Sequence, residues 1–171
     1  MNIKTILALF AAASFLVACS QPETSEDSAL EVQHRNYMKP HYEETVLDQY
    51  LHMKDALVSS YVSSVRDAGK LMYMQLDIST HEALIKPLTE IIESEDLGIQ
   101  REAFARLSLA MQIAIENDDP LVSKGREALF LQFCPMAFGN QGAFWLSSEH
   151  TILNPFYGEE MLTCGVVRDS L

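Results

Sequence analysis

Basic residues are scarce in this sequence. Lys and Arg number 12 against 24 Asp and Glu among 171 residues, which gives a formal net charge of −12. Nucleic-acid binding needs a basic face for the phosphates, and anionic lipid surfaces also attract basic segments. The charge balance therefore argues against nucleic acid as a partner and gives no support for direct docking on an anionic lipid surface.

Recognisable catalytic motifs are also lacking. The sequence contains no nucleophile elbow, no Gly-rich phosphate loop, no dinucleotide-binding fingerprint and no Cys-x-x-Cys pair. We therefore expect a protein that binds rather than one that catalyses. Apolar residues make up 48% of the chain, which is enough for one domain with a hydrophobic core, whereas the length is too short for two large ones.

The first residues have the pattern of an export signal. The apolar stretch Ile6–Ala18 is too short to span a bilayer as a helix. It ends in Leu16-Val17-Ala18-Cys19, which resembles a bacterial lipobox. The resemblance implies that residues 1–18 are a lipoprotein signal peptide and that Cys19 carries the lipid, so that the protein is anchored in the cell envelope.

The residues after Cys19 suggest where the anchored protein lies. Ser20, rather than Asp, follows the cysteine. In a Gram-negative cell this resembles a lipoprotein that is sorted to the outer membrane and faces the periplasm. Residues 19–39 include many Glu, Ser and Thr and have no apolar periodicity, so we expect an acidic flexible tether there. A single folded domain is expected over residues 40–171.

Four stretches between Pro40 and Asn117 carry apolar residues at helical spacing. Amphipathic helices bury their apolar faces in a shared core, and short connections favour antiparallel neighbours. We therefore predict a mainly α protein with an antiparallel bundle of about four helices. Thr80 is predicted as an N-cap, and Pro87 predicts either a kink or a helix that begins there. The apolar stripes run from Val46 to Leu57, Tyr61 to Leu76, Leu84 to Ile92 and Phe104 to Ile115.

The C-terminal third is irregular and rich in aromatic residues. Short buried strands are predicted at Leu129–Phe133 and Gly165–Arg168, and a turn at Asn154–Gly158. A segment this irregular cannot fold alone, so we expect it to pack on the bundle with its aromatic side chains covering one end. Trp145 is expected to be buried, and Asn154 is expected to cap the turn.

Two cysteines remain once Cys19 is assigned to lipid, and each has a methionine close by. Cys134 and Met136 would lie on one side of an extended segment, and Met161 and Cys164 on one face of a helical turn. Thiolate and thioether ligands suit Cu(I) and related soft ions. If the two segments meet, the four sulfurs predict a soft-metal site.

Other interpretations of the same residues stay open on spacing alone. A disulfide between Cys134 and Cys164 would close a loop of about 30 residues and stabilise the fold by roughly 3–4 kcal/mol in the chain-entropy model. Such a bond is permitted outside the cytosol. For a metal site, His150 is the nearest nitrogen ligand, and His52 and His81 are distant candidates.

Several motifs of the chain form one compound pattern. They are Phe133–Ala137, Gly142–Leu146, Ile152–Gly158 and Met161–Gly165, with Tyr50–Val58 and Gln100–Ser108 upstream. From Val46 to Val167 the pattern closely resembles a bacterial domain of unknown function. That domain is found alone in exported proteins and also fused to periplasmic adaptors of heavy-metal efflux pumps. The resemblance implies a helical domain with an envelope role in copper or silver handling, and it places metal binding ahead of the simple disulfide.

A shorter motif points the same way. Cys134-Pro135-Met136 resembles the core of the small heavy-metal-binding module of copper-transport proteins. In that module His usually follows Met, whereas Ala137 takes that place here.

The expected function follows from these patterns. We expect an envelope lipoprotein that binds or hands over Cu(I) or Ag(I), with Cys134, Met136, Met161 and Cys164 as ligands and no catalysis. The alternative is a non-catalytic interaction module. In that case Cys134 and Cys164 form a structural disulfide, and the surface docks on an efflux adaptor or another envelope protein.

Overall fold

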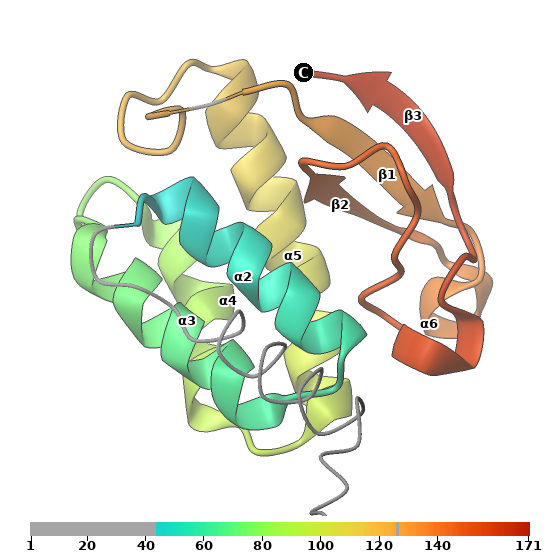
Figure 1. Cartoon of the computed structure of the whole chain (residues 1–171). Helices are drawn as coiled ribbons and strands as arrows, with labels where there is room; N and C mark the ends of the chain where they lie inside the picture. Colours follow the sequence, from blue (N-terminus) through green and yellow to red (C-terminus); the bar gives the residue numbers. More distant parts are fainter. Residues whose placement is uncertain (1–43, 126) are drawn as a thin grey trace, which may run out of the picture.

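The structure, a computed structural model, describes residues 44–125 and 127–171. The predicted signal peptide, the predicted lipidation site Cys19 and the predicted tether lie outside the described residues. An N-terminal bundle of four helices precedes a small antiparallel sheet, which confirms the predicted fold class (Figure 1). No helix in the described parts of the chain is long and apolar enough to cross a membrane. The bundle helices are α2 (Val46–Val58), α3 (Val62–Gln75), α4 (Glu82–Glu93) and α5 (Leu97–Glu116).

Side-chain caps explain where α2 and α5 begin. The Thr45 hydroxyl accepts the N–H of Asp48 at 3.2 Å, and the Asp48 carboxylate accepts the N–H of Thr45 at 2.8 Å, which is a capping box. Asp96 caps α5 by accepting the N–H of Ile99 at 2.9 Å. The caps satisfy N–H groups that have no partner within the helix, so both helices that contact the sheet start at defined residues.

The start of α4 differs from the prediction. Its N-cap is His81, and the Thr80 hydroxyl instead lies 2.9 Å from Nδ1 of His81. Pro87 lies inside α4 and not at its first position, so the helix does not begin there. A proline has no N–H for the carbonyl four residues earlier, but the burial of Leu88 and Ile91 in the core stabilises the helix around it.

The sheet has the strand order β2-β1-β3, and both outer strands are antiparallel to β1. The sequence predicts β1 and β3 nearly in place, but it misses β2. The expectation that the last strand is buried is wrong, because four of the five β3 residues are exposed at the edge of the sheet. Four of the five β2 residues are buried, so this strand lacks the alternation that identifies a strand in a sequence. The elements are β1 (Phe130–Cys134), α6 (Ala137–Asn140), β2 (Ala143–Ser147), the 3-10 helix η1 (Gly158–Met161) and β3 (Val166–Ser170).

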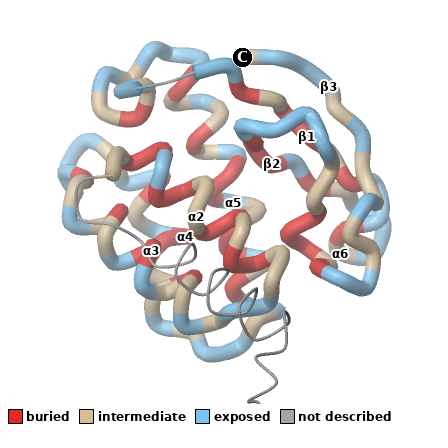
Figure 2. Tube along the Cα trace, in the orientation of Figure 1, coloured by how far each residue is buried: buried red, intermediate tan, exposed pale blue. Residues whose placement is uncertain are grey.

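One hydrophobic core joins the bundle to the C-terminal segment. The sheet lies beside α2 and α5, away from α3 (Figure 1). Buried residues cover the facing sides of the helices and much of β1 and β2, whereas β3 is largely exposed (Figure 2). The Tyr50 hydroxyl lies 2.7 Å from the Ser108 hydroxyl and accepts the N–H of Leu146 at 3.0 Å. The C-terminal segment therefore packs on the bundle, as its aromatic content predicts.

Candidate functional site

The two cysteines of the C-terminal segment meet. Cys134 ends β1, and Cys164 lies between η1 and β3. Their Sγ atoms are 3.3 Å apart although 30 residues separate them in the sequence. Both are free thiols. We call these two residues the cysteine pair; their approach is what the soft-metal interpretation and the disulfide interpretation both require.

Backbone contacts position the two cysteines. Cys134 pairs with Ala143 in the ladder between β1 and β2. The N–H of Cys164 donates to the carbonyl of Met161 at 3.0 Å, and the carbonyl of Cys164 accepts a hydrogen bond from Nδ2 of Asn154 at 2.7 Å. The first cysteine is therefore fixed by the sheet, and the second by a turn and one buried amide.

A glycine brings the Cys164 segment against the indole of Trp145. Gly165 has a φ of +155°, and a Cβ at this residue would lie 2.9 Å from Cη2 of Trp145 and 3.1 Å from the carbonyl of Phe133. Any larger residue would push the segment away from β1 and β2. The residue that follows Cys164 therefore packs directly against Trp145, the single tryptophan of the sequence.

The two sulfurs differ in accessibility, and the pKa of the more exposed one is raised. Cys134 is 0% exposed, whereas Cys164 is partly exposed. The hydrogen bond with Cys134 raises the pKa of the Cys164 thiol, and burial and charge repulsion from Cys134 raise this pKa further. Loss of the proton from Cys164 is therefore harder than from an ordinary cysteine thiol.

We expect iodoacetamide to modify Cys164 at least about tenfold faster than Cys134 in the folded, reduced protein, because only Cys164 is accessible to the reagent. Pulse labelling followed by peptide mass spectrometry measures both rates in one sample. In concentrated guanidinium chloride the two rates should converge. Equal rates in the folded protein would contradict the burial of Cys134.

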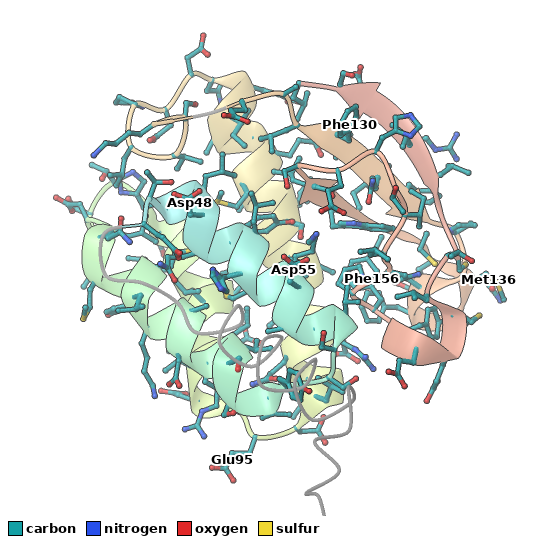
Figure 3. The ribbon with its side chains drawn as sticks, in the orientation of Figure 1. Asp48, Asp55, Glu95, Phe130, Met136 and Phe156 are labelled. Carbon is teal, nitrogen blue, oxygen red and sulfur yellow. The ribbon has the colours of Figure 1, made fainter. Side chains whose placement is uncertain are left out.

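The structure corrects one step of the methionine argument. Pro135 and Met136 form a turn after β1, with φ −90° and ψ −11° at Met136, so the backbone is not extended. The expectation that Cys134 and Met136 share one side of a strand is therefore wrong. Met136 is 45% exposed, and Figure 3 shows it at the outer edge of the C-terminal segment, whereas Phe156 faces the bundle.

The second methionine lies as its spacing predicts. Met161 ends η1, and its carbonyl accepts the N–H of Cys164, so the two residues belong to one turn. For both Met136 and Met161, the role of thioether ligand stays a prediction.

The candidate histidines have other partners. Nδ1 of His52 is 3.2 Å from the Glu44 carboxylate, and Nε2 of His81 is 3.3 Å from the Asp119 carboxylate. The His150 ring packs edge-on against Phe130 with 5.2 Å between centroids. The contacts of these three histidine side chains are therefore with residues other than the two cysteines.

The available donors limit which metals fit. Within residues 44–125 and 127–171, no three His, Cys, Asp or Glu side chains cluster closely enough to hold a metal ion. A structural Zn²⁺ site uses four such ligands. At the cysteine pair the donors that meet are two sulfurs, and two sulfur ligands fit a soft monovalent ion such as Cu(I) or Ag(I).

Sequence analysis misses one residue that shapes this region. Gln132 in β1 is fully buried, and its Nε2 lies 2.8, 3.4 and 3.2 Å from the carbonyls of Glu149, His150 and Thr151. It therefore fastens the loop after β2 to the central strand. The signal in the sequence is a single amide inside the apolar run Phe130–Cys134.

Comparison with known proteins gives one match. A family model described as a protein of unknown function (DUF3347) matches residues 46–121. No curated protein and no solved structure matches the chain. The matched range holds α2 to α5 and ends before β1, so the cysteine pair lies beyond it. The helical part of the chain thus matches a domain whose function is unknown.

Proposed function

We propose that the protein binds Cu(I) or Ag(I) through Cys134 and Cys164 and buffers the ion or hands it over, without catalysing a reaction. The observation that carries this proposal is the 3.3 Å approach of two sulfurs from distant parts of the sequence. Thiolates are preferred ligands of soft ions, and donors that are already close lose little freedom on binding.

The unequal exposure of the two sulfurs supports a role in transfer. Cys134 is buried and Cys164 is partly exposed, so a sulfur ligand of a partner would approach from the Cys164 side. Met136 and Met161, each close in sequence to one cysteine, are the proposed thioether ligands. The proposed setting is the periplasmic face of the outer membrane, with lipid on Cys19. A periplasmic efflux adaptor is the proposed partner.

We expect the reduced protein to bind one equivalent of Cu(I) tightly in an oxygen-free titration against a chromophoric Cu(I) chelator. Both thiols must lose their protons on binding. The pKa of Cys164 is raised by its hydrogen bond with Cys134. The apparent affinity should therefore fall as the pH is lowered, by about tenfold per pH unit for each thiol that is deprotonated.

Serine variants locate the site in the same titration. Cys134→Ser with Cys164→Ser should abolish the tight equivalent, and Met136→Leu or Met161→Leu should weaken it. Met74→Leu is the matched control, because Met74 is an exposed methionine on α3. Stoichiometric binding by the double serine variant would disprove this site, and no binding by the reduced wild type would disprove the proposed function.

The same sulfur contact favours a second candidate, an interaction module with a structural disulfide between Cys134 and Cys164. Peptide mass spectrometry of protein trapped with acid in its own compartment distinguishes the two. A substantial dithiol or metal-bound fraction is expected for the metal-binding protein. A disulfide in essentially every molecule would support the interaction module instead.

A further inference from the structure

Asn154 uses all of its polar groups to hold the segment that carries Cys164. Its side chain is fully buried. Nδ2 donates to the Cys164 carbonyl at 2.7 Å, and Oδ1 accepts the N–H of Phe156 at 2.8 Å. Its backbone N–H donates to the Leu162 carbonyl at 2.8 Å, and its carbonyl accepts the N–H of Gly158 at 2.9 Å. One residue therefore connects the turn before η1 with the residues after it.

The turn that contains Asn154 is hydrogen-bonded to the helical bundle through Arg101. Nε of Arg101, on α5, donates to the carbonyl of Pro155 at 3.0 Å. The same guanidinium reaches the Leu57 carbonyl at 3.3 Å and the Ser60 hydroxyl at 3.2 Å, at the end of α2. Asn154 therefore lies between a turn that is hydrogen-bonded to the bundle and the backbone of Cys164.

The position of the Cys164 sulfur depends on this support more than that of the Cys134 sulfur does. Cys134 belongs to the central strand, which is paired on both sides. Cys164 lies before β3, outside the sheet. Its carbonyl is held by a hydrogen bond of 2.7 Å from the side chain of Asn154. A loss of that bond would let the Cys164 segment move relative to a fixed Cys134.

We infer that Asn154 is a positioning residue that sets the Cys164 sulfur against the Cys134 sulfur. This inference rests on the proposed function, because a metal site made of two sulfurs requires both Sγ atoms to lie close together. The positioning can also be measured without a metal. The tendency of two thiols to form a disulfide reports how often their sulfurs meet, which is their effective concentration.

The experiment equilibrates the protein with reduced glutathione and glutathione disulfide. The Cys164 thiolate attacks glutathione disulfide and expels one glutathione thiolate. The Cys134 thiolate then attacks the Cys164 sulfur of the mixed disulfide and expels the second. Two electrons pass from the protein dithiol to glutathione disulfide, and the two protons pass to the released glutathiones. Alkylation and mass spectrometry give the oxidised fraction.

We expect Asn154→Ala and Asn154→Asp to lower this exchange equilibrium constant at least about tenfold. Asp keeps an acceptor for the N–H of Phe156 but has no N–H for the Cys164 carbonyl, so it tests the donor alone. Arg101→Lys should act in the same direction with a smaller change, because it weakens the hold on the Pro155 carbonyl. If Asn154→Ala does not fold, the other two variants carry the test.

Gln100→Ala is the matched control. Gln100 is also a fully buried amide, and its Nε2 lies 3.3, 3.4 and 3.1 Å from the carbonyls of Val62, Ile91 and Ser94. It should lose stability but keep the exchange equilibrium of the wild type. An equilibrium constant that changes no more in the Asn154 variants than in Gln100→Ala would overturn the inference.

A Cu(I) titration of the same variants separates the two proposals. If the proposed function holds, the Cu(I) affinity should fall together with the exchange equilibrium constant. If wild type binds no Cu(I) but the Asn154 variants still lose thiol exchange, the proposed function fails and the positioning role stands.

Discussion

Trp145→Ala should lower the free energy of unfolding by about 3–5 kcal/mol, the range for removing a large aromatic side chain from a core. Trp145 is the largest fully buried side chain among the residues that the structure describes. Its ring meets the Phe156 ring edge-on with 5.6 Å between centroids. A typical domain has a total stability of about 5–15 kcal/mol, so this single change removes a large part of it. Urea unfolding followed by circular dichroism measures the loss.

Phe144→Ala provides the comparison, because Phe144 precedes Trp145 in β2 but its side chain is 38% exposed. It should cost about 1 kcal/mol. A loss below about 1 kcal/mol for Trp145→Ala would show that the indole does not support the core as its burial indicates.

The tryptophan prediction extends to the cysteine pair. Gly165 packs against the Trp145 ring, so removal of the ring leaves a space beside the residue that follows Cys164. Trp145→Phe fills much of that space and should retain the thiol exchange equilibrium better than Trp145→Ala does. The stability of the core and the geometry of the cysteine pair are therefore connected through one side chain.

The helical half of the fold could be predicted because its signal is local. Val46, Tyr50, Met53 and Leu57 occur at helical spacing, and all four are buried in α2. Amphipathic periodicity identifies such a helix without knowledge of its partners. The proline in α4 shows the limit, since the packing of the whole helix outweighs the local preference of Pro87 to end or begin one.

The candidate site could be predicted only in part, because its contacts are not local. The sequence identifies Cys134 and Cys164 as candidate sulfur ligands. Their approach, however, depends on the pairing of β1 with β3, two strands that are joined by a long connection. The predicted position of Met136 requires that the extended backbone of β1 continues, whereas the chain turns at Pro135. Asn154 is recognisable as a turn cap, but its hydrogen bond to Cys164 exists only in the folded chain.

Tyr50→Ala should also cost about 3–5 kcal/mol, because it removes a ring that is fully buried and stacked on Phe104 at 5.0 Å. Tyr50→Phe keeps the ring and isolates the hydroxyl. Without that hydroxyl, the N–H of Leu146 and the hydroxyl of Ser108 lose their hydrogen bonds to Tyr50 in the core. We expect this variant to lose about 1–3 kcal/mol at neutral pH.

The hydroxyl of Tyr50 also predicts how stability changes in alkali. Burial raises the pKa of Tyr50, and hydrogen bonds with Leu146 and Ser108 oppose this only in part. In the unfolded chain tyrosine ionises near pH 10. The folded protein keeps the proton to higher pH, so the contribution of Tyr50 to stability is complete below about pH 10 and is lost as the pH rises further.

The rest of the chain contributes equally to wild type and Tyr50→Phe, so their difference in unfolding free energy isolates this group. Above about pH 10 that difference should shrink by up to about 1.4 kcal/mol per pH unit. Urea unfolding of both proteins at several pH values tests this, and a difference that stays constant would show that the Tyr50 hydroxyl ionises as readily in the folded core as in water.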